Sequence, residues 1–180
     1  HQTLSLTDLE KVKLLDRQDT KFVFNQIQLP LILDKIKPFY RILEISNDLV
    51  FTYDTTYFDT DNFLFYYQHH NENRKRFKVR FRKYSSNSNT FFEIKIKNNK
   101  NRTVKKRLMV DEMNGYLGEQ EKDFVSEIIG LQPIGLTAKL NIQFSRITLA
   151  DNSFNERLTI DTNLSAKNGS SSKIFDNLVI

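Results

Sequence analysis

Apolar and polar residues alternate with a period of two along several stretches of the chain, which is typical of β-strands that bury one face. The clearest stretch is residues 77–82, FKVRFR, where every odd position is apolar and every even position is cationic. Residues 92–97, FEIKIK, repeat this alternation, and residues 104–108, VKKRL, follow it more loosely. We therefore predict three neighbouring strands, joined by polar loops, whose apolar faces pack on a core.

The remaining pattern predicts a mixture of helices and further strands. Thr7 and Glu10 form a capping box for a first helix, Pro38 ends a second helix and Gly130 caps a third. Residues 63–70 fit either a short helix or an extended segment. We expect helices at 3–15, 25–37 and 112–130, and strands at 16–24, 40–45, 49–58, 75–84, 90–97, 102–110, 138–149, 154–161 and 173–180.

Strands outnumber helices in this pattern, and many of the connections are short. We therefore predict an α+β fold, in which about eight strands form an antiparallel β-barrel, or tunnel, with flanking helices. Closing the sheet removes exposed strand edges, which are otherwise prone to pair with other chains. At 180 residues, we expect one domain spanning residues 1–180, with the helix at 1–15 as its N-terminal part.

Composition narrows the class of protein. The chain has no Cys, which excludes disulfides and thiolate metal sites. It has no signal peptide and no apolar run of about 18 residues, so we expect a cytoplasmic protein without a transmembrane segment. The overall charge of +5 hides a strong asymmetry, because residues 74–107 hold 14 of the 27 basic residues and one of the 22 acidic residues.

The period of two places this charge on one surface. Lys78, Arg80 and Arg82 share a face of the first strand, and we expect the same face to carry Glu93, Lys95, Lys97, Lys105 and Arg107. Two interpretations are open: a solvated outer face, or a binding site for a strong anion. Like charges directly across strands destabilise a sheet, and the near absence of acids favours the anion site. Arg and Lys are suited to phosphate oxygens.

Glu93 is the one acidic residue in this block, and it also has two interpretations. It can pair with a neighbouring Arg, or it can bind Mg²⁺ or Mn²⁺ beside phosphate oxygens. The two adjacent His residues, His69 and His70, point to opposite faces if the segment is a strand, and we interpret them as surface residues.

Seven short motifs resemble, in order, those of the VTC domain within the CYTH-like, or triphosphate tunnel metalloenzyme, superfamily. They are residues 17–22 (RQDTKF), 56–60 (TYFDT), 78–84 (KVRFRKY), 92–95 (FEIK), 104–108 (VKKRL), 144–146 (FSR) and 156–161 (ERLTID). The resemblance implies a tunnel that binds triphosphate or polyphosphate with Mn²⁺ or Mg²⁺. It also implies a phosphotransferase, a polyphosphate polymerase that transfers the terminal phosphate of ATP to a polyphosphate chain.

Residue by residue, the resemblance assigns phosphate-binding positions along the tunnel. They are Lys21, Lys78, Arg80, Arg82, Lys95, Lys105, Arg107, Arg146 and Arg157, of which Arg80, Arg82, Lys95, Arg146 and Arg157 are the catalytic candidates. Arg146 shares strand parity with Phe144, so a bulge is needed to turn it inward. The family's main metal ligand, in a Glu-x-Lys segment, is expected beyond Ile180, which leaves Glu93 as the metal candidate here.

Three further functions are open. A triphosphate hydrolase of the same superfamily needs the same cations and a positioned water. A non-catalytic module that binds polyphosphate or inositol phosphates needs the cations alone. Nucleic-acid binding also fits basic strands with interleaved aromatic residues. We do not expect it, because proteins that bind duplexes carry their charge on an outer surface.

Overall fold

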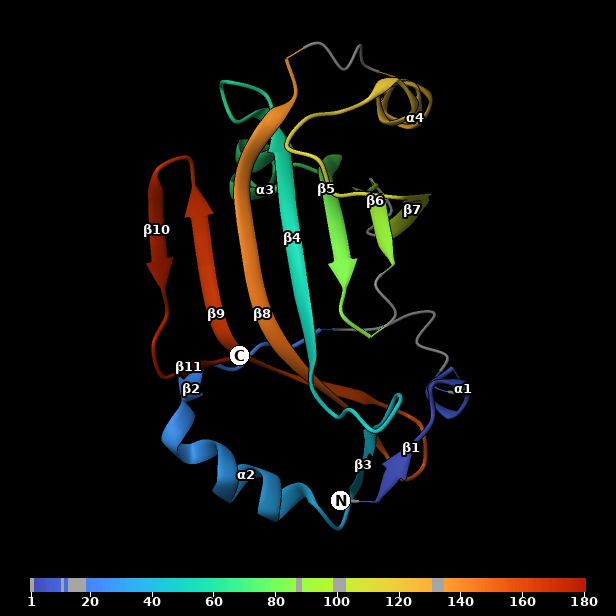
Figure 1. The fold of residues 1–180 in the computed structure, drawn as a ribbon, viewed down its shortest axis with the longest axis vertical. Helices are drawn as coiled ribbons and strands as arrows, with labels where there is room; N and C mark the ends of the chain where they lie inside the picture. Colours follow the sequence, from blue (N-terminus) through green and yellow to red (C-terminus); the bar gives the residue numbers. More distant parts are fainter. Residues whose placement is uncertain (1, 11, 13–18, 87–88, 99–102, 131–134) are drawn as a thin grey trace. The chain divides into compact units, whose positions relative to one another are not determined.

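The computed structural model describes residues 2–10, 12, 19–86, 89–98, 103–130 and 135–180 (Figure 1). The chain divides into two compact units, each of which is described separately. The first unit comprises His1–Tyr53, Gln143–Ser165 and Lys173–Ile180, and the second comprises Asp54–Ile142 and Ala166–Ser172. The expectation of a single domain over residues 1–180 stays a prediction.

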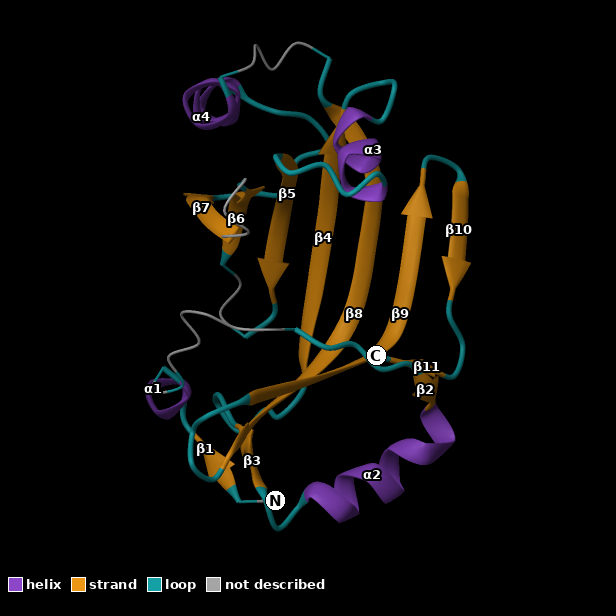
Figure 2. Cartoon of the chain, turned by 180° about the vertical axis from the view of Figure 1, so that it is seen from behind, coloured by secondary structure: helices purple, strands orange, loops and turns teal. Residues whose placement is uncertain are grey.

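The α+β class and the largely antiparallel sheet are confirmed (Figure 2). The hydrogen-bonded strand order is β1-β3-β8-β4-β5-β6-β7, and β9 adds to β8 and β10 to β9. β1 and β3 are parallel, whereas β3–β8, β5–β6 and β6–β7 are antiparallel. The strands are β1 (Thr3–Leu4), β2 (Phe24–Asn25), β3 (Tyr40–Leu43), β4 (Phe51–Asp59), β5 (Arg76–Tyr84), β6 (Thr90–Lys97), β7 (Thr103–Val110), β8 (Thr137–Asp151), β9 (Arg157–Asn168), β10 (Ser171–Ile174) and β11 (Leu178–Val179).

In the first unit, the second predicted helix is confirmed and the first is much shorter than predicted. Asn25 caps a 3₁₀ turn, η1 (Gln26–Gln28), which leads into α2 (Leu29–Ile36). Pro30 lies in the first turn, where its missing N–H removes no helical hydrogen bond. The first helix, α1, spans only Leu6–Leu9. Its capping box uses Ser5 and Asp8 rather than Thr7 and Glu10, because the helix begins at Leu6, two residues before the start that a Thr7 cap requires.

The predicted strand at 16–24 is wrong over its described part. Residues 16–18 lie outside the described residues, 19–23 have no regular structure, and only β2 pairs, antiparallel to β11. The turn at 46–48 is confirmed: Ser46 and Asn47 both have positive φ, 53° and 68°, and Ile45 bridges Asp48. Positive φ at both central positions is the geometry of a tight hairpin.

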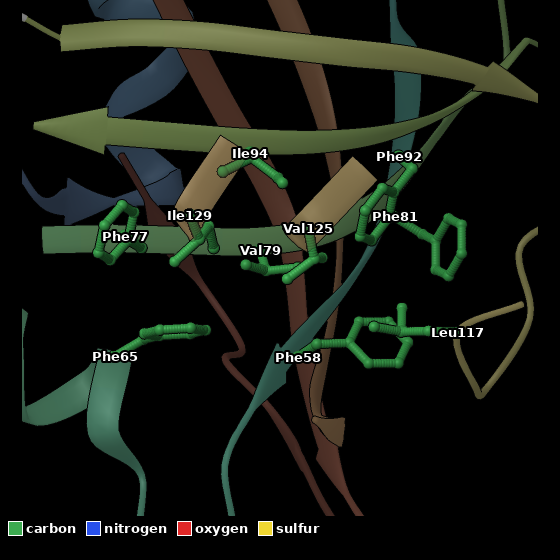
Figure 3. Close-up of a cluster of buried hydrophobic side chains, with 10 residues drawn as sticks. All are labelled: Phe58, Phe65, Phe77, Val79, Phe81, Phe92, Ile94, Leu117, Val125 and Ile129. Atoms are coloured by element: carbon green, nitrogen blue, oxygen red, sulfur yellow. The ribbon is translucent and has the colours of Figure 1, made fainter. Parts of the chain in front are cut away.

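In the second unit, the predicted strands of the basic block are confirmed. β5 and β6 pair from Arg76↔Lys97 to Lys83↔Thr90, and β6 and β7 pair from Lys97↔Thr103 to Thr90↔Val110. This register places the odd positions of β5 and the even positions of β6 on one face. Phe77, Val79 and Phe81 of β5 therefore point to the same side of the sheet as Phe92 and Ile94 of β6 (Figure 3).

Two helices supply apolar side chains to this core (Figure 3). Val125 and Ile129 come from α4 (Glu119–Ile129), and Phe65 comes from α3 (Leu64–His70). α3 settles the ambiguity at 63–70 in favour of a helix. The predicted helix at 112–130 begins late, since residues 112–118 are not helical, but it ends as predicted at Gly130, which has φ of 73°. A left-handed residue of this kind favours glycine.

The C-terminal strands differ in extent from the prediction. β8 and β9 are longer than expected, and β9 begins at Arg157 because residues 152–155 form a turn held by the side chain of Asp151. The predicted strand at 173–180 is divided into β10 and β11, which pair with different strands. None of the helices in the described ranges is long and apolar enough to cross a membrane.

Candidate functional site

The register of β5, β6 and β7 brings the predicted cations onto the face opposite the core. Each row across this face joins one residue from each strand. Three successive rows are Arg76–Lys97–Thr103, Lys78–Lys95–Lys105 and Arg80–Glu93–Arg107. Arg82 begins the next row, opposite Phe91. We call the first three rows and Arg82 the basic face. The strand parity predicted from the sequence is thus correct for every cation that the prediction placed on this face, and Arg76 joins them.

Glu93 lies in the middle of the basic face and is fully buried. Arg80 donates to its Oε2 atom from Nε at 2.9 Å and from Nη2 at 2.6 Å, and Lys105 donates to Oε1 from Nζ at 3.3 Å. Burial raises the pKa of Glu93, but the charge of Arg80 outweighs it and lowers the pKa below its usual range. Glu93 is therefore an ionised internal counter-ion.

The same contacts bear on the divalent metal that the sequence resemblance implies. Both carboxylate oxygens of Glu93 already accept hydrogen bonds from cations. Among the described residues, no three His, Cys, Asp or Glu side chains are grouped as metal ligands. Divalent cations prefer several oxygen ligands, so the residues of the basic face, in this arrangement, do not fit a metal held by Glu93.

β4 supplies two hydroxyl groups that the sequence analysis did not identify. Tyr57 accepts a hydrogen bond from Arg80 Nη1 at 3.2 Å, and Thr55 accepts one from Arg82 Nε at 3.0 Å. Burial raises the pKa of Tyr57, but the positive charge of Arg80 and its neighbours outweighs this effect and lowers the pKa. The hydroxyl of Tyr57 thus helps to hold the side chain of Arg80 in place, and the hydroxyl of Thr55 helps to hold that of Arg82. The TYFDT motif was the available signal, since it contains Tyr57.

Two other residues of that motif stabilise the fold and do not line the basic face. Phe58 is buried in the core of the second unit. Asp59 is 6% exposed, and its carboxylate accepts hydrogen bonds from the backbone N–H groups of Phe65 at 2.9 Å and Tyr66 at 2.8 Å. These donors lie in the first turn of α3, where backbone N–H groups have no helical partner. Asp59 therefore fixes the start of the helix that carries His69.

One part of the basic face is hollowed into an open cavity of about 260 Å³. Six of its eight lining residues are basic or His, and none is acidic. The lining residues are Tyr57, His69, Arg76, Lys78, Arg80, Lys95, Lys97 and Thr103. Burial, reinforced by the charges of Arg80 and Arg82, lowers the pKa of Lys95 to about 8. A group of cations this close favours an anion between them.

His69 joins this lining, although the sequence analysis interpreted it as a surface residue. That interpretation assumed a strand, whereas α3 turns His69 toward β5, where its Nε2 atom lies 3.1 Å from the carbonyl oxygen of Phe77. Burial and the charges of Lys78 and Arg76 lower the pKa of His69 to about 4. The imidazole is therefore neutral at pH 7.

Three predicted phosphate ligands belong to the first unit. Lys21 is exposed. Arg146 donates to both carboxylate oxygens of Asp161, each at 2.6 Å, and its guanidinium lies 5.0 Å from the ring centroid of Phe144, whose strand parity it shares as predicted. Arg157 is exposed and donates to the backbone oxygen of Leu9 at 3.3 Å. Their assignment to the phosphate site stays a prediction.

Comparison with known proteins gives a family match and several similar solved structures. The family model of the VTC domain matches residues 16–177. PH1819 from Pyrococcus horikoshii OT3 superposes with a TM-score of 0.44 and 10% identity, over 82% of this chain and 68% of that one. HpAC1 from Hippeastrum, which is described as having a dominant triphosphatase activity, has a TM-score of 0.43 and 12% identity, over 83% and 70%. No curated protein sequence matches this chain.

Proposed function

The chain belongs to the VTC domain family, and from this premise we propose that its basic face binds linear triphosphate or polyphosphate. The observation that carries the proposal is the cavity on that face, whose lining is mostly basic and contains no acidic residue. Arg80 and Lys95 are held close together there. Several cations in a partly buried site stabilise a chain of phosphates far better than they stabilise a single weak anion.

We further propose a polyphosphate polymerase. An oxygen of the terminal phosphate of the growing chain attacks the γ-phosphorus of ATP, and the bond from that phosphorus to the β–γ bridging oxygen breaks. The products are ADP and a polyphosphate longer by one unit. The attacking oxygen is already ionised, so no general base is required. Cations of the basic face, Lys95 among them, neutralise the charge that spreads over the transferring group, which is the main requirement of phosphoryl transfer.

One observation favours hydrolysis as a second candidate. His69 lines the cavity as a neutral imidazole, because its pKa is lowered to about 4. A neutral imidazole can accept a proton from a water molecule that attacks a phosphorus atom. The negative charge of a bound triphosphate would raise the pKa of His69 toward 7, which would make the imidazole a stronger base. In that reaction the products are free phosphate and a shorter phosphate chain.

A single assay separates these reactions. The protein is incubated with ATP, Mn²⁺ and a pyrophosphate primer, with EDTA in place of Mn²⁺ in a parallel reaction, and polyphosphate and free phosphate are both measured. Chain growth supports the polymerase, and free phosphate without polymer supports the hydrolase. Tight tripolyphosphate binding with neither product indicates a non-catalytic binding module. The reaction with EDTA measures how far either activity depends on the metal.

Two variants test the site itself. Arg80→Ala and Arg82→Ala each remove one of the cations assigned to the phosphate chain, and we expect tripolyphosphate affinity to fall at least tenfold in each. Lys106→Ala is the control, because Lys106 is exposed on strand β7 at a position of opposite parity to Lys105 and Arg107. If both arginine variants bound tripolyphosphate as tightly as the unmodified protein, the assignment of the basic face would be wrong.

A further inference from the structure

The face of β5–β7 that carries the cations changes from charged to mainly apolar residues at one end. Phe91 of β6 lies opposite Arg82 of β5 and Met109 of β7, in the row that follows Arg80–Glu93–Arg107. Two of the three residues in this row are apolar, whereas the three rows before it consist of charged residues and Thr103. The cavity lining ends before this row. The cation-lined part of the face is therefore followed directly by an aromatic and thioether surface.

The contacts of Phe91 show how this surface is built. The ring centroid lies 4.8 Å from the guanidinium carbon of Arg107, and Tyr84 meets the ring edge-on with centroids 5.9 Å apart. Phe91 is half-buried, and Met109 beside it is 64% exposed. An arginine that lies on an aromatic ring presents a flat cationic surface, and such a surface stacks well on other flat groups.

A chain of phosphates gains nothing from the apolar side chains of this surface. Phosphate oxygens are strongly hydrated and would lose hydrogen bonds to water beside Phe91 and Met109. A flat heteroaromatic ring, in contrast, stacks on aromatic side chains and on arginine planes, and methionine makes favourable contacts with rings. The two chemistries of the face thus match the two ends of a nucleoside triphosphate.

We propose that the surface formed by Tyr84, Phe91, Arg107 and Met109 is a subsite for the base of a nucleoside triphosphate. Successive rows on one face lie about 7 Å apart along the strands. The base at Phe91 therefore leaves one row of separation for the ribose before the phosphates reach Arg80. The proposal rests on the proposed function, because it requires the triphosphate to occupy the basic face.

This placement orients the nucleotide. The α-phosphate lies nearest the base, at Arg80, and the terminal phosphate points toward the cavity residues Lys78 and Lys95, one row farther along. The end of the nucleotide that is transferred thus lies in the most cationic part of the face. Inorganic tripolyphosphate uses the cations alone and has no group for the Phe91 surface.

The test compares two ligands that differ in the nucleoside. The affinities of ATP and inorganic tripolyphosphate are measured by calorimetry for the unmodified protein and for two variants, Phe91→Leu and Arg107→Lys. The second variant retains the charge and removes the flat stacking surface at an exposed position, so it does not depend on repacking. Tyr116→Leu is the control, since Tyr116 is an aromatic residue, 67% exposed, outside the basic face.

We expect ATP affinity to fall about fivefold to a hundredfold in Phe91→Leu, the range for losing one stacked base. The fall in ATP affinity is smaller in Arg107→Lys, and tripolyphosphate affinity changes less than twofold in Phe91→Leu. Fluorescence of an etheno-adenine analogue of ATP should be quenched on binding, and less so in both variants. If ATP and tripolyphosphate bind alike and neither variant separates them, the base subsite is refuted while the phosphate site stands. If tripolyphosphate itself does not bind, the proposed function fails as well.

Discussion

At the scale of single residues, Glu93 determines the charge balance of the basic face, because its buried carboxylate pairs with Arg80 and Lys105. Replacing Glu93 by Gln keeps the shape and removes the charge, which leaves the buried guanidinium of Arg80 without its anionic partner. Breaking a buried ion pair in this way costs about 3–5 kcal/mol. We expect E93Q to lose that much of its free energy of unfolding in urea, and tripolyphosphate to restore part of the loss.

Glu119→Gln is the matched control. Glu119 pairs with Lys122 at 2.6 Å, but its side chain is 85% exposed, and exposed pairs contribute little. Its loss should stay below about 0.5 kcal/mol. Similar losses in the two variants would show that the Arg80–Glu93 pair does not stabilise the unit.

Lys95 gives the site a dependence on pH. Its pKa is lowered to about 8, first by burial and then by the charges of Arg80 and Arg82, so the free protein loses this charge as pH rises through 8. A bound phosphate favours the charged amine and raises its pKa. Binding should therefore take up a proton near pH 8, and affinity for tripolyphosphate should fall above that pH. Calorimetry in two buffers of different ionisation enthalpy measures both effects.

The variant Lys95→Arg separates the part of the pH dependence that comes from Lys95 from the part that comes from titration of tripolyphosphate itself. The guanidinium stays charged over the whole range, so the variant should show only the pH dependence that belongs to tripolyphosphate. A profile identical to that of the unmodified protein would mean that Lys95 does not contact the phosphates.

At the scale of elements, helix α3 depends on one side chain that precedes it. The Asp59 carboxylate accepts hydrogen bonds from the backbone N–H groups of Thr60, Phe65 and Tyr66. Asp59→Ala leaves these donors without their partner, and loss of a helix cap costs about 1–2 kcal/mol. We expect that loss in urea unfolding, together with weaker tripolyphosphate binding, because α3 holds His69 at the cavity.

Asp61→Ala is the control for this element. Asp61 is 86% exposed and pairs with Lys139 at the surface, so its removal should change stability by less than about 0.5 kcal/mol. An equal effect of the two substitutions would indicate that α3 does not depend on its cap.

At the scale of the whole molecule, the question is whether the first unit contributes to the phosphate site. The family resemblance assigns Lys21 and Arg157 to the same tunnel as Arg80. If that assignment is correct, Lys21→Gln and Arg157→Gln should each lower tripolyphosphate affinity about threefold to tenfold, as expected for the loss of one phosphate contact. For long-chain polyphosphate, a polymeric anion, a plot of log affinity against log salt concentration should also fall linearly.

The slope of that plot provides an independent readout. Removing one phosphate contact lowers the slope by about one unit, whereas a change in folding leaves it unaltered. Affinity and slope that both match the unmodified protein would confine the site to the basic face of the second unit.

The sequence alone determined the strands within residues 74–107, the face of the sheet on which each of their side chains lies, and the family. Alternation with a period of two depends only on neighbouring residues, because successive side chains of a strand point to opposite faces. The same local chemistry determined the turn at Ser46 and Asn47 and the cap at Gly130. The order of seven motifs added the family, which the match over residues 16–177 confirmed.

Only the tertiary structure decided which groups meet the cations. The pairing of Arg80 with Glu93 depends on the register between β5 and β6, and the contact with Tyr57 depends on a strand 23 residues away. His69 reached the cavity because α3 is a helix docked on β5, which a dipeptide of two His residues does not reveal. Local patterns report which face a side chain occupies, whereas its partners and its pKa depend on segments distant in sequence.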